Sequence, residues 1–91
     1  MSLTDDSSVL SGLRDLDQQA IGTIYDQYFS EVYRYALYRI GDPTIAEDIA
    51  SDVFVRLLDT SQHGRGPHTN LKAWLLGTAS HIVTDHFRRT Y

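Results

Sequence analysis

The chain has no cysteine, and it lacks any apolar run of the ~20 residues that a membrane-spanning helix needs. The first absence excludes a disulfide framework and a metal site built on thiolates. The second, together with the lack of a charged-then-apolar leader, predicts a protein that is neither exported nor inserted into a membrane. We therefore expect a cytoplasmic protein.

Strand patterns and internal repeats are also missing, which leaves helices to form the fold. With 91 residues, 42% of them hydrophobic, the chain can bury one small core. We expect a flexible N-terminus over residues 1–8 and a single domain over residues 9–91. Its fold is predicted to be an all-α compact bundle of three main helices, with a short N-terminal helix around residues 9–16.

The formal net charge of -4 is unevenly spread along the chain. Residues 1–60 hold four basic and eleven acidic side chains, whereas residues 61–91 hold four basic ones, one acidic one and all four histidines. An acidic body followed by a basic end predicts two different binding surfaces.

The stretch from Ile45 to Leu58 is the one against which we expect the other helices to pack. Its apolar residues form two adjacent rows at four-residue spacing and cover more than half of the helix circumference. So wide an apolar arc predicts a helix placed between at least two others. The remaining arc is acidic, with Asp48 and Asp52 one turn apart. The apolar rows are Ile45, Ala46, Ile49, Ala50, Val53, Phe54, Leu57 and Leu58.

An apolar pattern of helical spacing from Ile21 to Ile40 predicts a helix before the central one. After the central helix, a polar stretch from Thr60 to Asn70 predicts a loop of about ten residues, and a last helix follows over 71–89. The first of these helices is expected to start at a cap, Asp15 or Asp17, and to end at Gly41. The central helix is expected to start at the cap Asp42 followed by Pro43, or at a capping box of Thr44 and Glu47. The last helix is expected to start at the cap Thr69 or Asn70.

The last helix has two unlike sides. One is apolar and is expected to face the core, whereas the other holds mostly small residues and ends in arginine. Since a glycine inside a helix costs about 1 kcal/mol relative to alanine, the small-residue side indicates close approach by another molecule, such as a nucleic-acid backbone. The core side is Leu71, Leu75, Thr78, Ala79, Ile82, Val83 and His86 or Phe87; the other side is Ala73, Gly77, Ser80, His81, Thr84 and Arg88.

Several of these features have simpler explanations. The acidic side of the central helix is, from composition alone, more often a solvated face than a docking site. Tyr25 and Tyr28 are expected in the core, and Trp74 either packs there or stacks on a base. His81 and Asp85 are too few for a metal site, and no nucleophile elbow or phosphate-binding loop occurs, so we expect no metal, no cofactor and no enzymatic activity.

Four ordered stretches carry a family resemblance: Ile24-Tyr-Asp-Gln-Tyr-Phe, Ala46-Glu-Asp-Ile-Ala-Ser-Asp-Val-Phe-Val-Arg-Leu, Leu71-Lys-Ala-Trp-Leu-Leu-Gly-Thr-Ala and Asp85-His-Phe-Arg-Arg. Together they resemble conserved region 2 of the sigma-70 family, and most closely its extracytoplasmic-function (ECF) group. The resemblance extends over residues 10–89. It implies a bacterial transcription initiation factor that binds core RNA polymerase and recognises the -10 promoter element as a melted single strand.

The resemblance also assigns roles to residues. In this family the helix that matches residues 46–58 docks on the clamp helices of the polymerase β′ subunit, which assigns Asp48, Ser51, Asp52 and Arg56 to core polymerase binding. The loop before the last helix holds a flipped base of the -10 non-template strand, and the last helix faces DNA. An anti-sigma factor is a further partner that the resemblance allows. The residues thereby assigned to DNA are His63, Arg65, His68, Asn70, Lys72, Trp74, Gly77, Ser80, His81, Thr84, Arg88 and Arg89.

The sequence departs from the family pattern in three places. Glutamine is usual where Ser51 stands, and Arg-Asn is common where Ser80 and His81 stand. Of the aromatic pair in primary sigma factors only Trp74 is present, beside Ala73, which fits the ECF group and implies weak intrinsic melting. The -35-binding region 4 domain is absent from this chain, so we expect a fragment of a longer factor.

Two other functions stay open. The first is a helical protein–protein interaction module, an adaptor or anti-sigma target without DNA binding, although the basic segment 61–91 argues against it. The second is a metal-dependent helical hydrolase, which would need a bound metal ion.

Overall fold

The structure of the protein, a computed structural model, describes residues 18–67 and 69–90. These residues form α2 (Gln18–Ile40), α3 (Pro43–Gln62) and α4 (Leu71–Thr90), and none of them lies in a strand. The predicted all-α fold with three main helices is therefore confirmed. Four predictions lie outside the described residues. They are the flexible start, the short N-terminal helix, the caps Asp15 and Asp17, and the role of His68.

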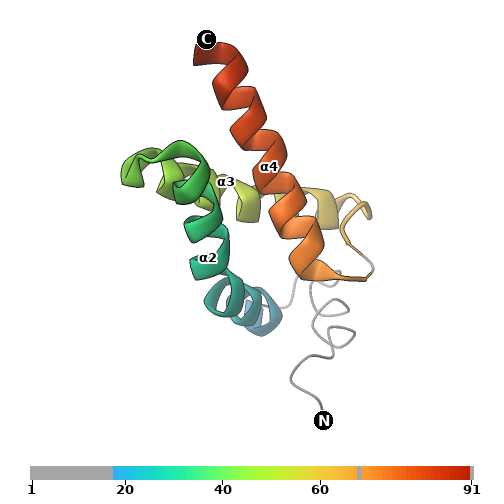
Figure 1. Cartoon of the computed structure of the whole chain (residues 1–91). Coiled ribbons are helices and arrows are strands. Elements are labelled where there is room, and N and C mark those ends of the chain that lie inside the picture. Colours follow the sequence, from blue (N-terminus) through green and yellow to red (C-terminus); the bar gives the residue numbers. More distant parts are fainter. Residues whose placement is uncertain (1–17, 68, 91) are drawn as a thin grey trace.

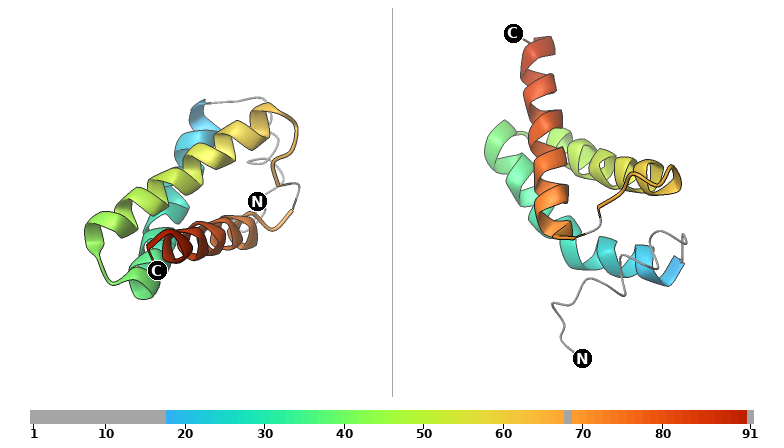
Figure 2. Two further views of the ribbon diagram at one scale, coloured as in Figure 1. Left: turned by 90° about the horizontal axis from the view of Figure 1, so that it is seen from above. Right: turned by 90° about the vertical axis from the view of Figure 1, so that its right-hand side faces the viewer.

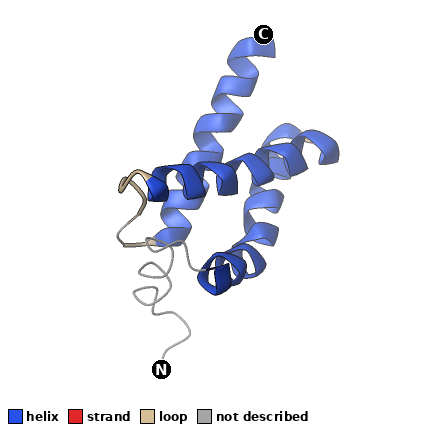
Figure 3. Ribbon diagram, turned by 180° about the vertical axis from the view of Figure 1, so that it is seen from behind, coloured by secondary structure: helices blue, strands red, loops and turns tan. Residues whose placement is uncertain are grey.

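Each of the three helices packs against the other two. Figures 1 and 3 show α3 crossing α4 steeply, and α2 packs against both. Helix α3 contacts both α2 and α4 and contributes more buried apolar side chains than either of them, so the prediction that other helices pack on it is confirmed. These side chains are Ala46, Ile49, Ala50, Val53, Phe54 and Leu57 from α3, Leu71, Leu75, Ala79, Ile82 and Val83 from α4, and Ile24, Val32 and Ala36 from α2.

The corner between α2 and α3 is formed as predicted. Gly41 follows the last residue of α2 with a left-handed φ of 80°, and its N–H donates to the Leu37 carbonyl at 2.7 Å. Asp42 then caps α3, because its Oδ1 accepts hydrogen bonds from the backbone N–H groups of Thr44 (2.9 Å) and Ile45 (3.3 Å). Pro43 occupies the first turn, where its missing N–H costs nothing.

The end of α3 differs from the prediction. The loop was expected from Thr60, but the helix continues to Gln62. The Thr60 hydroxyl donates to the Arg56 carbonyl at 2.8 Å and so stays compatible with the helix. The helix ends one turn later at a Schellman motif, in which Arg65 N–H donates to Thr60 O and Gly64 N–H donates to Ser61 O. Gly64 supplies the required left-handed φ of 71°.

The shortened loop is held against α3 by close packing. Ser61 and Pro67 are buried, and a Cβ at Gly66 would clash with the Ser61 hydroxyl and lie 3.2 Å from the Ser61 Cα. Asn70 then starts α4, since its Oδ1 accepts the Ala73 N–H at 3.2 Å. Of the two predicted caps for this helix, the structure therefore uses Asn70.

Helix α4 buries its N-terminal part more fully than its C-terminal part. Thr78 and one of His86 or Phe87 were expected in the core, but all three are only partly buried. The C-terminal end of α4 extends past the other two helices, as Figure 1 and the right-hand view of Figure 2 show, so fewer neighbours cover its last turns. No helix among residues 18–67 and 69–90 combines the length and apolar content needed to cross a bilayer.

Candidate functional site

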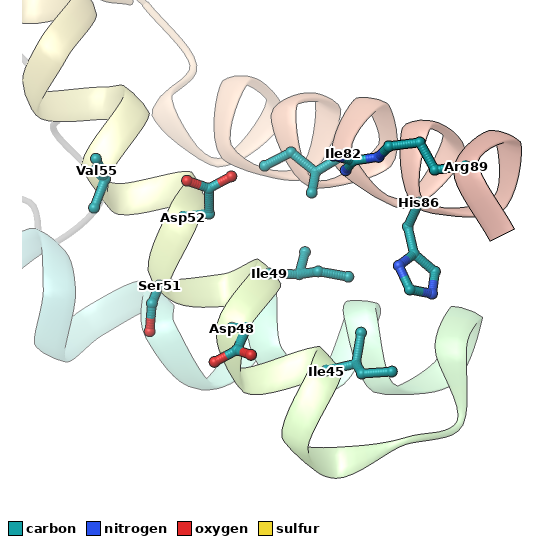
Figure 4. Close-up of a pocket in the computed structure, with 9 residues that line it drawn as sticks. All are labelled: Ile45, Asp48, Ile49, Ser51, Asp52, Val55, Ile82, His86 and Arg89. Atoms are coloured by element: carbon teal, nitrogen blue, oxygen red, sulfur yellow. The ribbon is translucent and has the colours of Figure 1, made fainter.

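Three of the four residues assigned to polymerase binding line one groove. Asp48, Ser51 and Asp52 lie on the side of α3 that the core leaves open, and the C-terminal half of α4 forms the opposite wall (Figure 4). The groove has a volume of about 570 Å³. Its lining residues are Ile45, Asp48, Ile49, Ser51, Asp52, Val55, Ile82, His86 and Arg89.

The groove combines apolar surface with unneutralised acid. Within the described part of the chain, Asp48 has neither an ion-pair partner nor a hydrogen-bond partner for its side chain. Asp52 forms an ion pair with Arg56, Oδ2 to Nε 3.5 Å, but both side chains are 47% exposed, so water screens the pair. Ile45 and Ile49 lie between these carboxylates and His86 of α4 in Figure 4. Such a surface suits a partner helix that carries both basic and apolar side chains.

Arg56 faces a different space from the other three residues. It lines a second groove, of about 420 Å³, together with Asp59 and Thr60 of α3. Trp74, Thr78 and His81 of α4 form its other side. Trp74 is partly buried and packs against the core. Of the two expectations for this residue, packing in the core or stacking on a base, the structure shows the packing.

The outer side of α4 brings together part of the residue set assigned to DNA. Gly77, Ser80, Thr84 and Arg88 recur at helical spacing on the side away from the core. A Cβ at Gly77 would meet no heavy atom within 4 Å, so the backbone there is open to an approaching molecule. Arg89 does not join this side. It lines instead the groove that Asp48, Ser51 and Asp52 line, which we call the acidic groove.

The other residues assigned to DNA are dispersed. Lys72 turns toward α2, where its Nζ lies 3.0 Å from Oε2 of Glu31. His63 ends α3, and its Nδ1 lies 2.8 Å from the Asp59 carbonyl oxygen. Arg65 is exposed in the loop, and Asn70 is used as a helix cap. The described part of the loop therefore presents only some of its polar side chains to a ligand.

The sequence analysis did not identify two exposed apolar residues, Val55 and Tyr25, as part of a candidate site. Val55 is 59% exposed, and Tyr25, which was expected in the core, is 45% exposed. The ring centroid of Tyr25 lies 4.8 Å from that of Phe29, on which it stacks, and 5.3 Å from that of Phe54, so the ring is partly covered. Val55 could have been found, because it is the apolar residue of its helix that falls outside the two buried rows.

These two residues line a third, apolar groove of about 290 Å³. It shares Ser51 and Val55 with the acidic groove, so the two are continuous along α3. The remaining lining residues are Ile21, Phe54, Leu57 and Leu58. Across residues 18–67 and 69–90, no three histidine, aspartate or glutamate side chains are grouped so that they could hold a metal ion.

Comparison with known proteins gives consistent matches. The family model for Sigma-70 region 2 matches residues 24–91. The ECF RNA polymerase sigma factor BldN of Streptomyces coelicolor is 39% identical over 72 residues, which cover 79% of this chain and 27% of BldN. The ECF RNA polymerase sigma factor SigX of Bacillus subtilis is 31% identical over 72 residues, which cover 79% of this chain and 37% of SigX.

A solved structure of an RsbN–BldN complex contains a chain of the same fold. Its TM-score is 0.76 at 34% sequence identity, over 88% of this chain and 58% of the solved one. Of the two curated relatives, the chain spans only about a quarter of the length of BldN and less than two fifths of that of SigX.

Proposed function

Because the chain belongs to the Sigma-70 region 2 family, in its ECF group, we propose that it acts in transcription initiation by binding core RNA polymerase and the melted -10 element. In this proposal the acidic groove on α3 receives the polymerase β′ clamp helices. The outer side of α4 and the loop before it receive the non-template strand. The family is one of transcription factors, so the proposal assigns no catalytic residue.

The observation that carries the polymerase part is the composition of the acidic groove. Asp48 is exposed and unpaired within the described residues, and it lies beside the apolar surface of Ile45, Ile49 and Val55. An unpaired carboxylate contributes little to folding at the surface, whereas opposite a basic partner it speeds association and fixes register. Ser51 is shorter than the glutamine usual at its position, so the flanking carboxylates are expected to contribute most of the polar contact.

The test reverses the charge of the groove. In the double variant Asp48→Lys/Asp52→Lys, binding to core RNA polymerase should fall strongly, while the fold persists because both positions are on the surface. The matched control is Asp26→Lys/Glu47→Lys, which changes the net charge equally at exposed residues outside the groove. A folded Asp48→Lys/Asp52→Lys protein that competes for polymerase as well as the control does would refute the assignment.

The DNA part is supported by the open backbone at Gly77 and by the arginine at the end of the same side, Arg88. Small residues allow a nucleic-acid strand to approach, and arginine neutralises phosphate. Since few basic side chains lie on this side, the binding of isolated single-stranded DNA should be weak, and the slope of log affinity against log salt should be shallow, at about -0.7 per neutralised phosphate. Titration of a labelled -10 oligonucleotide at low and moderate salt checks this expectation.

A second candidate function is a protein–protein module without DNA binding. The observation that favours it is the structural match to a chain of the RsbN–BldN complex, in which a chain of this fold assembles with a second protein. An anti-sigma factor bound along the continuous grooves of α3 would then compete with polymerase. If the chain binds no single-stranded DNA even at low salt, this candidate is preferred.

A further inference from the structure

The outer side of the C-terminal half of α2 carries a basic and aromatic patch, which consists of Arg34, Tyr35, Tyr38 and Arg39. Tyr38 is 87% exposed, far more than the other exposed large hydrophobic side chains of the described residues. Residues 34, 35 and 38 recur at the spacing of one helix side, and Arg39 adjoins it through Tyr35. None of the functions assigned above uses this patch.

The patch is positively charged although it belongs to the acidic half of the chain. No acidic side chain occurs from residue 32 to residue 41. Within the described part of the chain, Arg34 has no ion-pair or hydrogen-bond partner for its side chain. Arg39 is held in place by Tyr35, whose hydroxyl accepts a hydrogen bond from Nη1 at 2.7 Å and whose ring centroid lies 5.7 Å from the guanidinium carbon.

The patch is continuous with the start of α4. Glu31 lies one turn before Tyr35 on the same side of α2, and its carboxylate forms the 3.0 Å ion pair with Lys72 of α4. This pairing offsets the negative charge of Glu31, and it joins this side of α2 to the helix that carries the residues assigned to DNA. Arg34, Arg39 and Lys72 against Glu31 therefore leave a net positive charge on this part of α2 and the first turn of α4.

We propose that the patch binds single-stranded nucleic acid, with a base stacked on Tyr38 and backbone phosphates held by Arg34 and Arg39. The inference rests on the proposed DNA-binding function of α4, and it extends that interface onto α2. An exposed aromatic ring beside arginines that have no carboxylate partner among residues 18–67 and 69–90 matches the two components of single-strand binding, which are stacking platforms and phosphate neutralisation.

The experiment measures the binding of the 91-residue chain to a labelled single-stranded DNA oligonucleotide of about 16 nucleotides over a range of salt concentrations. Tyr38→Ala should weaken binding by about tenfold and Tyr38→Phe much less, because phenylalanine keeps the stacking surface. Arg34→Gln should make the slope of log affinity against log salt less steep by about 0.7, the contribution of one phosphate. Both positions are exposed, so circular dichroism should show unchanged folding in all three variants.

Two further variants separate this inference from the proposed function. Thr23→Glu, which lowers the net charge by the same amount at an exposed site three turns away on α2, is the matched control and should bind DNA as wild type does. Arg88→Gln reports on α4. If Arg88→Gln weakens binding whereas Tyr38→Ala and Arg34→Gln equal the control, the patch is not a DNA site and the proposed function stands. If wild type binds no oligonucleotide at low salt, both the DNA-binding function and this inference fail.

Discussion

Lys72 in the first turn of α4 and Glu31 in the middle of α2 form an ion pair with a distance of 3.0 Å between Nζ and Oε2. This ion pair joins two helices. The other ion pairs that lysine or arginine forms among the described residues, Arg56 with Asp52 and Arg88 with Asp85, each join side chains of one helix that are three or four residues apart. The sequence analysis assigned Lys72 to DNA, yet the structure gives its charge a partner within the protein.

Replacing Glu31 should therefore affect DNA binding more than stability. Glu31→Gln leaves Lys72 free to contact phosphate, so single-strand affinity should rise and the salt slope should steepen by up to about 0.7. Both side chains are substantially exposed, so the free energy of unfolding should change by less than about 1 kcal/mol. Urea unfolding and oligonucleotide titration on the same samples test both parts, and a lower DNA affinity in Glu31→Gln would contradict the first.

Val53 and Val55 provide a matched pair of identical residues on α3. Val53 is fully buried and Val55 is 59% exposed in the groove surface. Val53→Ala should lower the free energy of unfolding by about 2 kcal/mol, because two buried methyl groups are lost and a cavity remains. Val55→Ser should change stability by less than about 0.5 kcal/mol but weaken polymerase binding. Equal polymerase binding by wild type and Val55→Ser would remove Val55 from the proposed interface.

Gly66 should tolerate no side chain while Ser61 is present. In Gly66→Ala the new Cβ clashes with the Ser61 hydroxyl, so we expect a loss of roughly 1–3 kcal/mol. Ser61→Ala alone should be close to neutral, since this buried hydroxyl has no hydrogen-bond partner in the described structure. The double variant should recover part of the loss, and thermal unfolding of the three proteins measures the coupling. Additive effects of the two changes would show that the contact is absent.

Gly77 is the opposite case, because a Cβ there meets nothing within 4 Å. Gly77→Ala should raise the free energy of unfolding by about 0.5–1 kcal/mol, as expected for alanine in place of glycine in a helix interior. If DNA approaches the backbone at this position, affinity for the single strand should nevertheless fall. A variant that is more stable and binds DNA as well as wild type would exclude close approach at Gly77.

Arg88 and Arg89 are neighbours in the sequence that should separate the two proposed interfaces. Arg88→Gln should weaken single-strand binding and make the salt slope less steep by about 0.7. Arg89 lines the acidic groove, so Arg89→Gln should leave DNA binding unchanged and slightly strengthen polymerase binding, since a positive charge opposite a basic partner is removed. The reverse pattern would place Arg89, rather than Arg88, on the DNA side.

The local features of the chain could be predicted with few errors. Gly41, Asp42 and Asn70 act at the helix boundaries as their chemistry requires, because capping depends on side chains and backbone groups within four residues of each other. The error at the end of α3 has the same local origin. Thr60, Ser61 and Gln62 have composition typical of a loop, but the Schellman motif that ends the helix is formed by Gly64 and Arg65.

The amino-acid sequence by itself determined the fold class, the helix order and the family of this protein, since periodicity, capping and motif order are properties of neighbouring residues. Only the tertiary structure decided which side chains share a surface. The crossing of α3 and α4 brings Arg89 into the groove that Asp48 lines and brings Arg56 and Trp74 to another groove, and the packing of α2 on α4 pairs Glu31 with Lys72. Helical periodicity states which residues lie on one side of a helix, but the side that a neighbouring helix covers depends on how distant apolar surfaces pack.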